Sequence, residues 1–595
     1  MSEINKNQKK QNVLGGAMVL VVATALVKII GAVYKIPLTG VIGSLGRGYF
    51  ASAYNIYTPI YAITMAGLPV AVSTVVSRNT ALGKYKDVKQ VMKVTFPLFL
   101  GLGVLGTAVL LLASRPYVAS VNSPLAIYSV LMIAPSILFC CVMSTFRGYY
   151  EGLRNMYPTA VSQVIESLGK LIFGLTLSKL VINYALSQVE VTGSVFGEEA
   201  VDGKLPAVAY AIAAAAAILG VTLGTVFACL FVVLRHKIKK DGITKEQLIN
   251  SPICSPKRET VKEIIKIAIP TALSSLVLNI TNFIDTWMIQ NRLDGVVENS
   301  LDVIMNIYGK SIESANIATE NIHTFLYGAY DTTLDFRNLI PTIVMTLGVS
   351  AIPVVSAAMA KKDGKLVSET VNTVFRTTML IALPAGAGFF ALSQPILSML
   401  YNGTENQSAI AIAAPVLALY GLIMPLLSLS SPLTNILQGI GRADVPAKTL
   451  AIACIFKVGL NYLLIGIPEI NVKGAVFGTA CFYLVCIGIN LTVLKKESGV
   501  KIDFKTVVLK PLVAAVLCGG SAYLSFRLLS PVLTFGDPSS RLNGTTVSCI
   551  ISIGIAVVVY AVSALLLKTL VKNDILMLPK GEKIAKILEK YKLIV

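Results

Sequence analysis

Long apolar runs alternate with short polar connections along almost the whole chain. A helix needs about 20 predominantly apolar residues to cross a bilayer, because its backbone groups must be satisfied inside the segment. Fourteen runs reach that length, at roughly 13–38, 51–76, 91–114, 123–146, 157–182, 206–235, 262–291, 336–359, 373–400, 408–438, 446–467, 473–494, 508–530 and 545–571. The connection at 293–335 has room for an interfacial helix. The pattern predicts an all-α polytopic membrane protein with about 14 transmembrane helices.

The composition agrees with a membrane interior. Of the 595 residues, 55% are hydrophobic and 14% are charged, whereas a soluble domain carries about 25% charged residues. The nine cysteines show no metal-type spacing or paired framework, and the two histidines, His236 and His323, are far apart. We therefore expect neither a metal nor another cofactor. The first run, 13–38, lacks a small-residue cleavage site, so we expect a first helix there and not a signal peptide.

The net charge of +20 follows the predicted topology. Lys and Arg gather in alternate connections, namely the N-terminus, Arg78–Lys93, Arg147–Arg154, Arg235–Lys262, Lys361–Arg376, Arg442–Lys448, Lys495–Lys510 and the tail from Lys568. The two longest intervening connections, which contain Glu190–Asp202 and Asp294–Asp335, are acidic. The positive-inside rule then predicts a multi-pass protein of the bacterial plasma membrane with both termini in the cytoplasm. The same distribution argues against a nucleic-acid partner, and it favours contact with membrane lipids.

The longest basic connection divides the predicted helices into two groups. It falls after six helices and contains two prolines, Pro252 and Pro256. We expect an N-terminal six-helix lobe, a cytoplasmic linker, a C-terminal six-helix lobe, and two extra helices with a basic cytoplasmic tail. These parts correspond to residues 1–235, 236–261, 262–496 and 497–595.

A faint parallel repeat supports the two lobes. Arg154 and Pro158 precede the fifth helix, and Arg442 and Pro446 stand 288 residues later, before the eleventh. Proline is common at a helix start, so the matching arginine carries more of the argument. A repeat of this kind, with the substrate between the halves, is a common transporter architecture.

Charged residues inside the predicted spans are the best functional candidates, because each costs several kcal/mol unless it is paired or hydrated. Lys28 lies near the middle of the first helix, and Lys35 follows seven residues later on the same face. We predict that Lys28, Lys35 and Lys170 bind substrate in a central cavity. The alternatives are a structural carboxylate partner for Lys28 and snorkelling to the interface for Lys35.

The acidic candidates are Glu166 and Asp285. Glu166 and Lys170 are four residues apart on the fifth helix, so they can form an ion pair on one face. Glu166 then either positions Lys170, titrates with substrate, or serves only to bury the lysine. Asp285, on the seventh helix, is either a counter-ion to a lysine or a packing residue. Lys457, on the eleventh helix, is the weakest candidate.

Enzyme signatures are missing from the sequence. It has no Walker-type phosphate loop, no HExxH helix and no GxSxG elbow, and no soluble part is large enough for an ATPase. We expect a transporter and not an enzyme, driven by an ion gradient, the membrane potential or the gradient of its substrate.

Several motifs resemble a known family. They are Lys28-Ile-Ile-Gly-Ala-Val-Tyr-Lys35-Ile-Pro-Leu-Thr, Ile42-Gly-Ser-Leu-Gly-Arg-Gly-Tyr-Phe, Gly67-Leu-Pro-Val-Ala-Val-Ser, and the stretch from Phe146 to Glu166. The chain resembles the stage V sporulation protein B family of the multidrug/oligosaccharidyl-lipid/polysaccharide exporter superfamily. The resemblance implies two six-helix lobes, two extra C-terminal helices and alternating access.

That superfamily includes the MurJ-type lipid II flippases, whose central cavity is lined by basic residues. Lys28 matches the position where such flippases tend to carry an arginine on the first helix. Their basic pair on the second helix has no counterpart, because Tyr54 to Ser77 is uncharged. Site residues therefore cannot be transferred one by one.

The leading hypothesis is a flippase that moves an undecaprenyl-diphosphate-linked saccharide, most plausibly lipid II, to the outer leaflet for cell-wall synthesis in growth or sporulation. Its partners are the lipid-linked oligosaccharide, membrane lipids and, as candidates, cell-wall synthesis proteins. Alternatives are a cation-coupled multidrug exporter, a non-transporting scaffold in a cell-wall assembly complex, and a membrane glycosyltransferase. Lysines at mid-membrane favour an anionic cargo over an organic cation.

Overall fold

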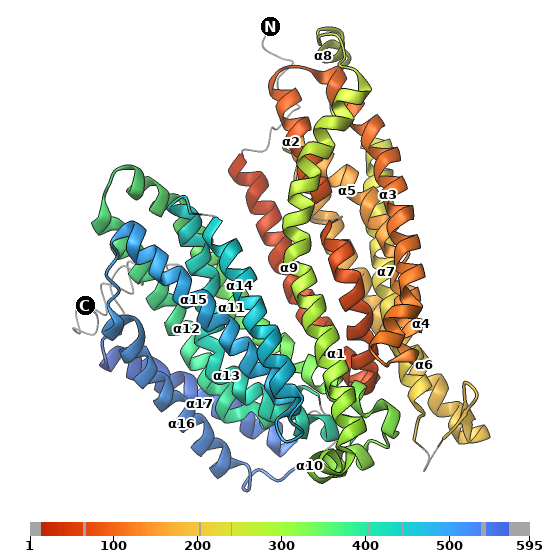
Figure 1. Ribbon diagram of the computed structural model, residues 1–595, viewed down its shortest axis with the longest axis vertical. Helices are drawn as coiled ribbons and strands as arrows, with labels where there is room; N and C mark the ends of the chain where they lie inside the picture. Colours follow the sequence, from red (N-terminus) through yellow and green to blue (C-terminus); the bar gives the residue numbers. More distant parts are fainter. Residues whose placement is uncertain are drawn as a thin grey trace. The chain divides into compact units, whose positions relative to one another are not determined.

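The computed structural model describes residues 13–63, 67–200, 204–239, 241–401, 404–442, 444–536 and 543–569 (Figure 1). In these ranges the only strands are β1 (Ser194–Val195) and β2 (Glu198–Glu199), an antiparallel pair with Ser194 opposite Glu199. All other regular structure in the described ranges is helical. The all-α class predicted from the apolar runs is confirmed.

The helices of the first half of the chain are α1 (Val13–Ala62), α2 (Leu68–Ala81), α3 (Tyr85–Ser120), α4 (Ile127–Ile133), α5 (Ser136–Gly152), α6 (Tyr157–Thr192), α7 (Ala207–Lys239), α8 (Lys245–Ile249) and α9 (Lys257–Asn299). Those of the second half are α10 (Leu301–Ser314), α11 (Ile322–Ala360), α12 (Gly364–Leu400), α13 (Thr404–Gly439), α14 (Asp444–Ile465), α15 (Gly474–Ser498), α16 (Lys510–Leu529) and α17 (Gly544–Leu566). Single turns precede α4, α11, α15 and α16 at Pro124–Ala126, Thr319–Asn321, Asn471–Lys473 and Lys505–Leu509.

The positions of the spans predicted from the sequence fit these helices. Within the described residues, ten helical segments are long and apolar enough to cross a membrane. Three of the four other predicted spans coincide with α6, α9 and α11, and the end of α1 with α2 supplies the fourth. The short helix α10 lies in the connection that had room for an interfacial helix. A polytopic fold with about 14 spanning helices is therefore confirmed.

Helix α1 covers the first predicted span and the beginning of the second. The two parts meet at Gly43, whose φ of 64° and ψ of −178° are not helical. A positive φ favours glycine, because a Cβ atom would be strained there. Arg47 bridges this break, since its Nη1 donates a hydrogen bond to Thr39 Oγ1 at 3.2 Å. Gly43 therefore separates two helical segments within one continuous element.

The chain forms two compact units. The first consists of residues Met1–Asn291 and Asn316–Gly328, and the second of Arg292–Ala315 and Ala329–Val595. Helix α9 thus begins in the first unit and ends in the second, and α11 does the same. In the second unit, α16 and α17 pack on each other and on α12, where Tyr560 Oη donates to the Leu380 carbonyl oxygen at 2.7 Å. The lobe and linker boundaries expected from the sequence stay a prediction.

Glycines bring α6 and α7 into backbone contact in the first unit, where the two helices lie side by side (Figure 1). Gly169 faces Gly224, and Gly220 faces Gly174. A Cβ on Gly169, Gly220 or Gly224 would collide with the opposite backbone, and a Cβ on Gly174 would collide with the Tyr34 side chain. Small residues are enriched at such close helix crossings in membranes. A Cβ at Gly224 would also meet the backbone of Glu166 and Lys170. Two of the predicted site residues are therefore carried on a tightly packed helix pair.

The segment after α7 is bonded to the start of α3. Asp87 Oδ1 accepts a hydrogen bond from the Ser255 backbone N–H at 2.8 Å, and Gln90 Nε2 donates to the Ser255 carbonyl oxygen at 2.7 Å. Asp241 accepts from Tyr149 Oη at 2.7 Å and forms an ion pair with Lys89 at 2.7 Å. The segment predicted as a linker is thus attached to α3 and α5 of the first unit.

Candidate functional site

Lys170 projects from α6 into a group of tyrosines in the first unit. Its Nζ donates a hydrogen bond to Tyr54 Oη at 3.1 Å, and it lies 4.9 Å and 5.1 Å from the ring centroids of Tyr34 and Tyr54. Tyr34 is buried, and its hydroxyl lies 3.4 Å from the Ala217 carbonyl oxygen on α7. A cation over an aromatic face is stabilised by the ring quadrupole without being neutralised. These partners hold the lysine in place among the tyrosine rings.

Glu166 forms an ion pair with Arg147 of α5. Arg147 Nη2 lies 3.1 Å from Glu166 Oε2, and the side chains are 2% and 20% exposed. Arg147 Nε also donates to Ser162 Oγ at 2.8 Å. A buried charge requires such partners, because its desolvation costs several kcal/mol. The sequence analysis considered only Lys170 as a partner of Glu166, and that pairing stays a prediction. It missed Arg147, which was counted only as part of a basic connection.

A row of aromatic residues on α1 joins these two groups. Phe50, Tyr54, Tyr57 and Tyr61 recur at a spacing of three or four residues and so share one face. Successive ring centroids lie 4.8 Å, 6.0 Å and 5.3 Å apart. Tyr61 interacts electrostatically with Glu166 and Arg147 at one end of the row. The spacing was visible in the sequence, but the second helix was examined there only for charges. We call Lys170, Tyr34, Tyr54, Glu166 and Arg147 the Lys170 cluster.

The two lysines of the first predicted span differ in their surroundings. Lys35 is half-buried, and its charge acts on Tyr54 of the Lys170 cluster. Lys28 is exposed, and it has no hydrogen bond or ion pair with another residue that the structure describes. Seven residues of helix correspond to about 10 Å along the axis. Lys28 thus lies on α1 about two turns from Lys35, and its role in binding stays a prediction.

Asp285 is buried on the part of α9 that belongs to the first unit, with 6% of its surface exposed. Its helix contacts α1 and α3, because Gln290 Nε2 donates to Ser52 Oγ and Trp287 Nε1 donates to Ser120 Oγ, each at 3.1 Å. These neighbours fit the packing interpretation of Asp285 as well as the counter-ion interpretation. Its predicted role stays open.

The second unit holds cations beside aromatic rings of its own. Lys457 is buried on α14, with its Nζ 5.9 Å from the ring centroid of Phe482. The guanidinium of Arg337 on α11 lies 5.6 Å from the ring centroid of Tyr420, whose hydroxyl is 3.2 Å from that of Tyr330. Arg337 lies at the start of the predicted span 336–359 and was not singled out from the sequence.

The chemistry of the Lys170 cluster suits anion binding. Lysine and tyrosine offer N–H and O–H donors together with positive charge. In the described part of the chain, no group of three His, Cys, Asp or Glu side chains is arranged to hold a metal ion. The arrangement can hold a phosphate-bearing group by charge and hydrogen bonding within a low-dielectric surrounding.

Comparison with known proteins gives two family matches. The profile of the polysaccharide biosynthesis protein family matches residues 13–359, more than half of the chain. A second profile, described as lipid II flippase MurJ, matches residues 339–536.

Individual relatives agree with these matches. The chain is 27% identical over 520 residues to the lipid II flippase MurJ of Bacillus subtilis (strain 168), which covers 85% of this chain and 87% of the relative. It is 21% identical over 512 residues to the stage V sporulation protein B of the same organism, covering 86% and 88%. The resemblance to that family, inferred from the sequence motifs, is confirmed.

A solved structure supports the fold. A lipid II flippase MurJ in an inward closed conformation superimposes with a TM-score of 0.60 at 15% identity, covering 92% of this chain and 98% of that one. At that identity the likeness concerns the fold alone. The first family profile covers more than half of the chain. The chain therefore belongs to the polysaccharide biosynthesis protein family.

Proposed function

We propose that the protein is a flippase that moves an undecaprenyl-diphosphate-linked saccharide, lipid II in the first instance, from the inner to the outer leaflet by alternating access. The similarity to proteins named lipid II flippase supports this cargo. The observation that carries the proposal is a lysine held by tyrosines within spanning helices. A transporter of this kind catalyses no covalent step, so we propose that the protein is not an enzyme.

The physical argument concerns the diphosphate. A group with about two negative charges does not cross hydrocarbon without compensation, because charge–charge interactions and desolvation are both large at low dielectric. Lys170 and Lys35 supply compensation beside Tyr54, and Lys28 supplies it further along α1. Arg147 engages Glu166 and so competes with the lysines for that carboxylate. Release at the outer leaflet then needs these contacts to weaken as the surroundings of the lysines change.

The location proposed is the bacterial plasma membrane, with both termini in the cytoplasm. The basic connections that alternate along the chain support this orientation through the positive-inside rule. Cell-wall synthesis proteins are the proposed partners at the outer face.

The test is lipid II translocation in cells depleted of their other flippases, with this chain supplied or withheld. Lipid II at the outer leaflet is measured with a membrane-impermeant probe. We expect translocation to depend on the chain and to be lost in Lys28→Ala at normal protein level. Lys179→Ala is the matched control, because Lys179 is an exposed lysine of α6 outside the Lys170 cluster.

The other outcomes discriminate between the alternatives. Equal translocation without the chain would refute lipid II as cargo. Export of organic cations under those conditions would favour the multidrug exporter. Capture of cell-wall enzymes with no transport of any lipid would favour the scaffold.

A further inference from the structure

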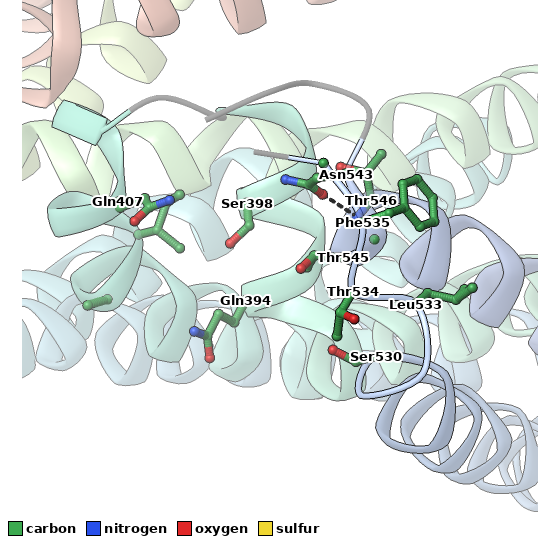
Figure 2. Close-up of a pocket in the computed structure, with 14 residues that line it drawn as sticks. Gln394, Ser398, Gln407, Ser530, Leu533, Thr534, Phe535, Asn543, Thr545 and Thr546 are labelled. Atoms are coloured by element: carbon green, nitrogen blue, oxygen red, sulfur yellow. Dashed lines mark hydrogen bonds between the residues drawn. The ribbon is translucent and has the colours of Figure 1, made fainter. Parts of the chain in front are cut away.

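A polar pocket lies in the second unit, where four helices end. It has a volume of about 590 Å³ and is bounded by the last turns of α12, the first turns of α13, the segment after α16 and the start of α17 (Figure 2). Small-molecule sites span about 300–1,000 Å³. Every described residue of its lining belongs to the second unit, whereas the Lys170 cluster belongs to the first.

The lining is neutral and rich in hydrogen-bonding groups. Three amides (Gln394, Gln407 and Asn543) and several hydroxyls face it, with one half-exposed aromatic ring, Phe535. No described residue of the lining is charged. An amide offers both donors and acceptors, and a hydroxyl offers one donor and two acceptors. A ligand that matches this lining has no net charge and carries many paired donors and acceptors around a compact ring.

The pocket is built by close backbone contacts. The Gly544 N–H donates to the Phe535 carbonyl oxygen at 2.8 Å, and a side chain at Gly544 would collide with the Leu533 carbonyl oxygen. Asn543 Oδ1 accepts from the Thr546 N–H at 2.8 Å and caps α17, as the dashed line in Figure 2 shows. These contacts fix the segment after α16 against the first turn of α17.

Thr546 supplies an independent sign of a ligand. It lines the pocket with only 5% of its surface exposed, and its Oγ1 has no hydrogen-bond partner among the described residues. A buried hydroxyl without a partner costs about 1–3 kcal/mol, so most such groups in proteins are satisfied. Its Oγ1 is covered in this conformation, so rotation of the Thr546 side chain would bring the hydroxyl to a polar molecule bound in the pocket.

We propose that this pocket binds a neutral saccharide, of the N-acetylhexosamine type, at the outer face of the membrane. Hydroxyls and an acetamido group match the amides and hydroxyls of the lining, and Phe535 offers a surface for the apolar face of the sugar ring. The outer face follows from the positive-inside pattern, because α12 and α16 begin after basic connections and end at the pocket. The proposal does not depend on lipid translocation.

The experiment measures binding of N,N′-diacetylchitobiose to the full-length protein in nanodiscs. A second probe carries the same disaccharide on a prenyl diphosphate. We expect Thr546→Val to weaken binding at least tenfold while the unfolding temperature stays unchanged or rises, since the variant removes an unsatisfied hydroxyl. Ser563→Ala, which removes a hydroxyl on α17 away from the pocket, is the control and should bind as the parent does.

The two probes separate the sources of the saccharide. Binding of the free disaccharide that Thr546→Val weakens indicates recognition of wall glycan. If Thr546→Val weakens binding of the prenyl-linked probe and the free disaccharide does not bind, the pocket recognises a lipid-carried sugar. Binding of neither probe, or equal binding by Thr546→Val, overturns the proposal. A cysteine placed at the exposed Thr534 gives a second readout, because bound disaccharide should slow its labelling by an impermeant maleimide. Unchanged labelling at saturating disaccharide also overturns it.

Discussion

The Lys170 cluster and the neutral pocket represent opposite ways of building a polar site in a membrane protein. The cluster places charges inside spanning helices and surrounds them with tyrosines and one ion pair. The pocket uses amides and hydroxyls at helix ends and contains no charged side chain among its described lining. Charge in hydrocarbon costs several kcal/mol and neutral groups at the interface cost much less. A charged site therefore depends on its own internal pairing, whereas a neutral site depends on backbone shape.

The strongest test of this contrast is removal of Arg147. Arg147→Ala leaves Glu166 as a partly buried carboxylate without its ion pair, so we expect a loss of about 3–5 kcal/mol of stability. Thermal unfolding of the purified protein in detergent measures the loss. The double variant Arg147→Met with Glu166→Leu should recover most of it. An unfolding temperature equal to that of the parent for Arg147→Ala alone would show that the pair carries no stability.

Lys170→Met should separate function from stability. The variant keeps the length of the side chain and removes the positive charge, so we expect lipid II translocation to fall at least tenfold with little change in unfolding temperature. Lys170→Arg is the control and should retain most of the activity, since it keeps the charge over Tyr34 and Tyr54. Normal translocation by Lys170→Met would remove the cluster from the substrate path.

Glu166 and Lys170 allow a related distinction. If the protein with the two residues exchanged works as well as the parent, both are structural residues only. We expect exchange to fail, because Arg147 then faces a lysine in place of a carboxylate.

The neutral pocket should respond to backbone shape. Gly544→Ala places a Cβ against the Leu533 carbonyl oxygen, so we expect a loss of about 1–3 kcal/mol together with weaker disaccharide binding. Gly554→Ala, on the same helix with open space around it, should change neither. Unaltered stability and binding in Gly544→Ala would mean that the segment after α16 adjusts freely.

The smallest effect concerns pH and the segment after α7. Burial by itself raises the pKa of Asp241. Hydrogen bonds from Lys89 and Tyr149 and the charge of Lys89 together lower it by more, so its pKa lies below the ordinary value. The resulting stability is fully present above the unfolded-state pKa of about 3.9 and is lost as pH falls through the lower folded-state pKa.

We therefore expect Asp241→Asn to cost about 1 kcal/mol between about pH 5 and pH 7, and the difference from the parent to shrink as the pH falls below about 4. Unfolding temperatures of both proteins across this range provide the measurement. Lys89→Gln should reproduce the loss at pH 7. A difference that grows as the pH falls would contradict the sign of the shift.

The sequence allowed prediction of the parts whose signal is local. Apolar runs predict helices one at a time, and Lys35, Glu166 and Lys170 were recognised because a charge within such a run is conspicuous. The partners depend on packing between distant segments: Tyr54 lies 116 residues from Lys170, and Arg147 lies on another helix from Glu166. The pocket was not predictable in this way, because neutral residues at four helix ends carry no local signal. Gly544 and Thr546 gain their roles only when α17 meets the segment after α16.

The break at Gly43 divides α1 into two helical arms that both reach the Lys170 cluster. Tyr34 lies on one arm and Tyr54 on the other, and both rings contact the same ammonium group of Lys170. The glycine contacts between α6 and α7 keep that ammonium group on a stiff support. A change in the bend at Gly43 would therefore alter how many aromatic rings cover Lys170. The angle between the two arms of α1 would then affect how strongly the site binds an anion.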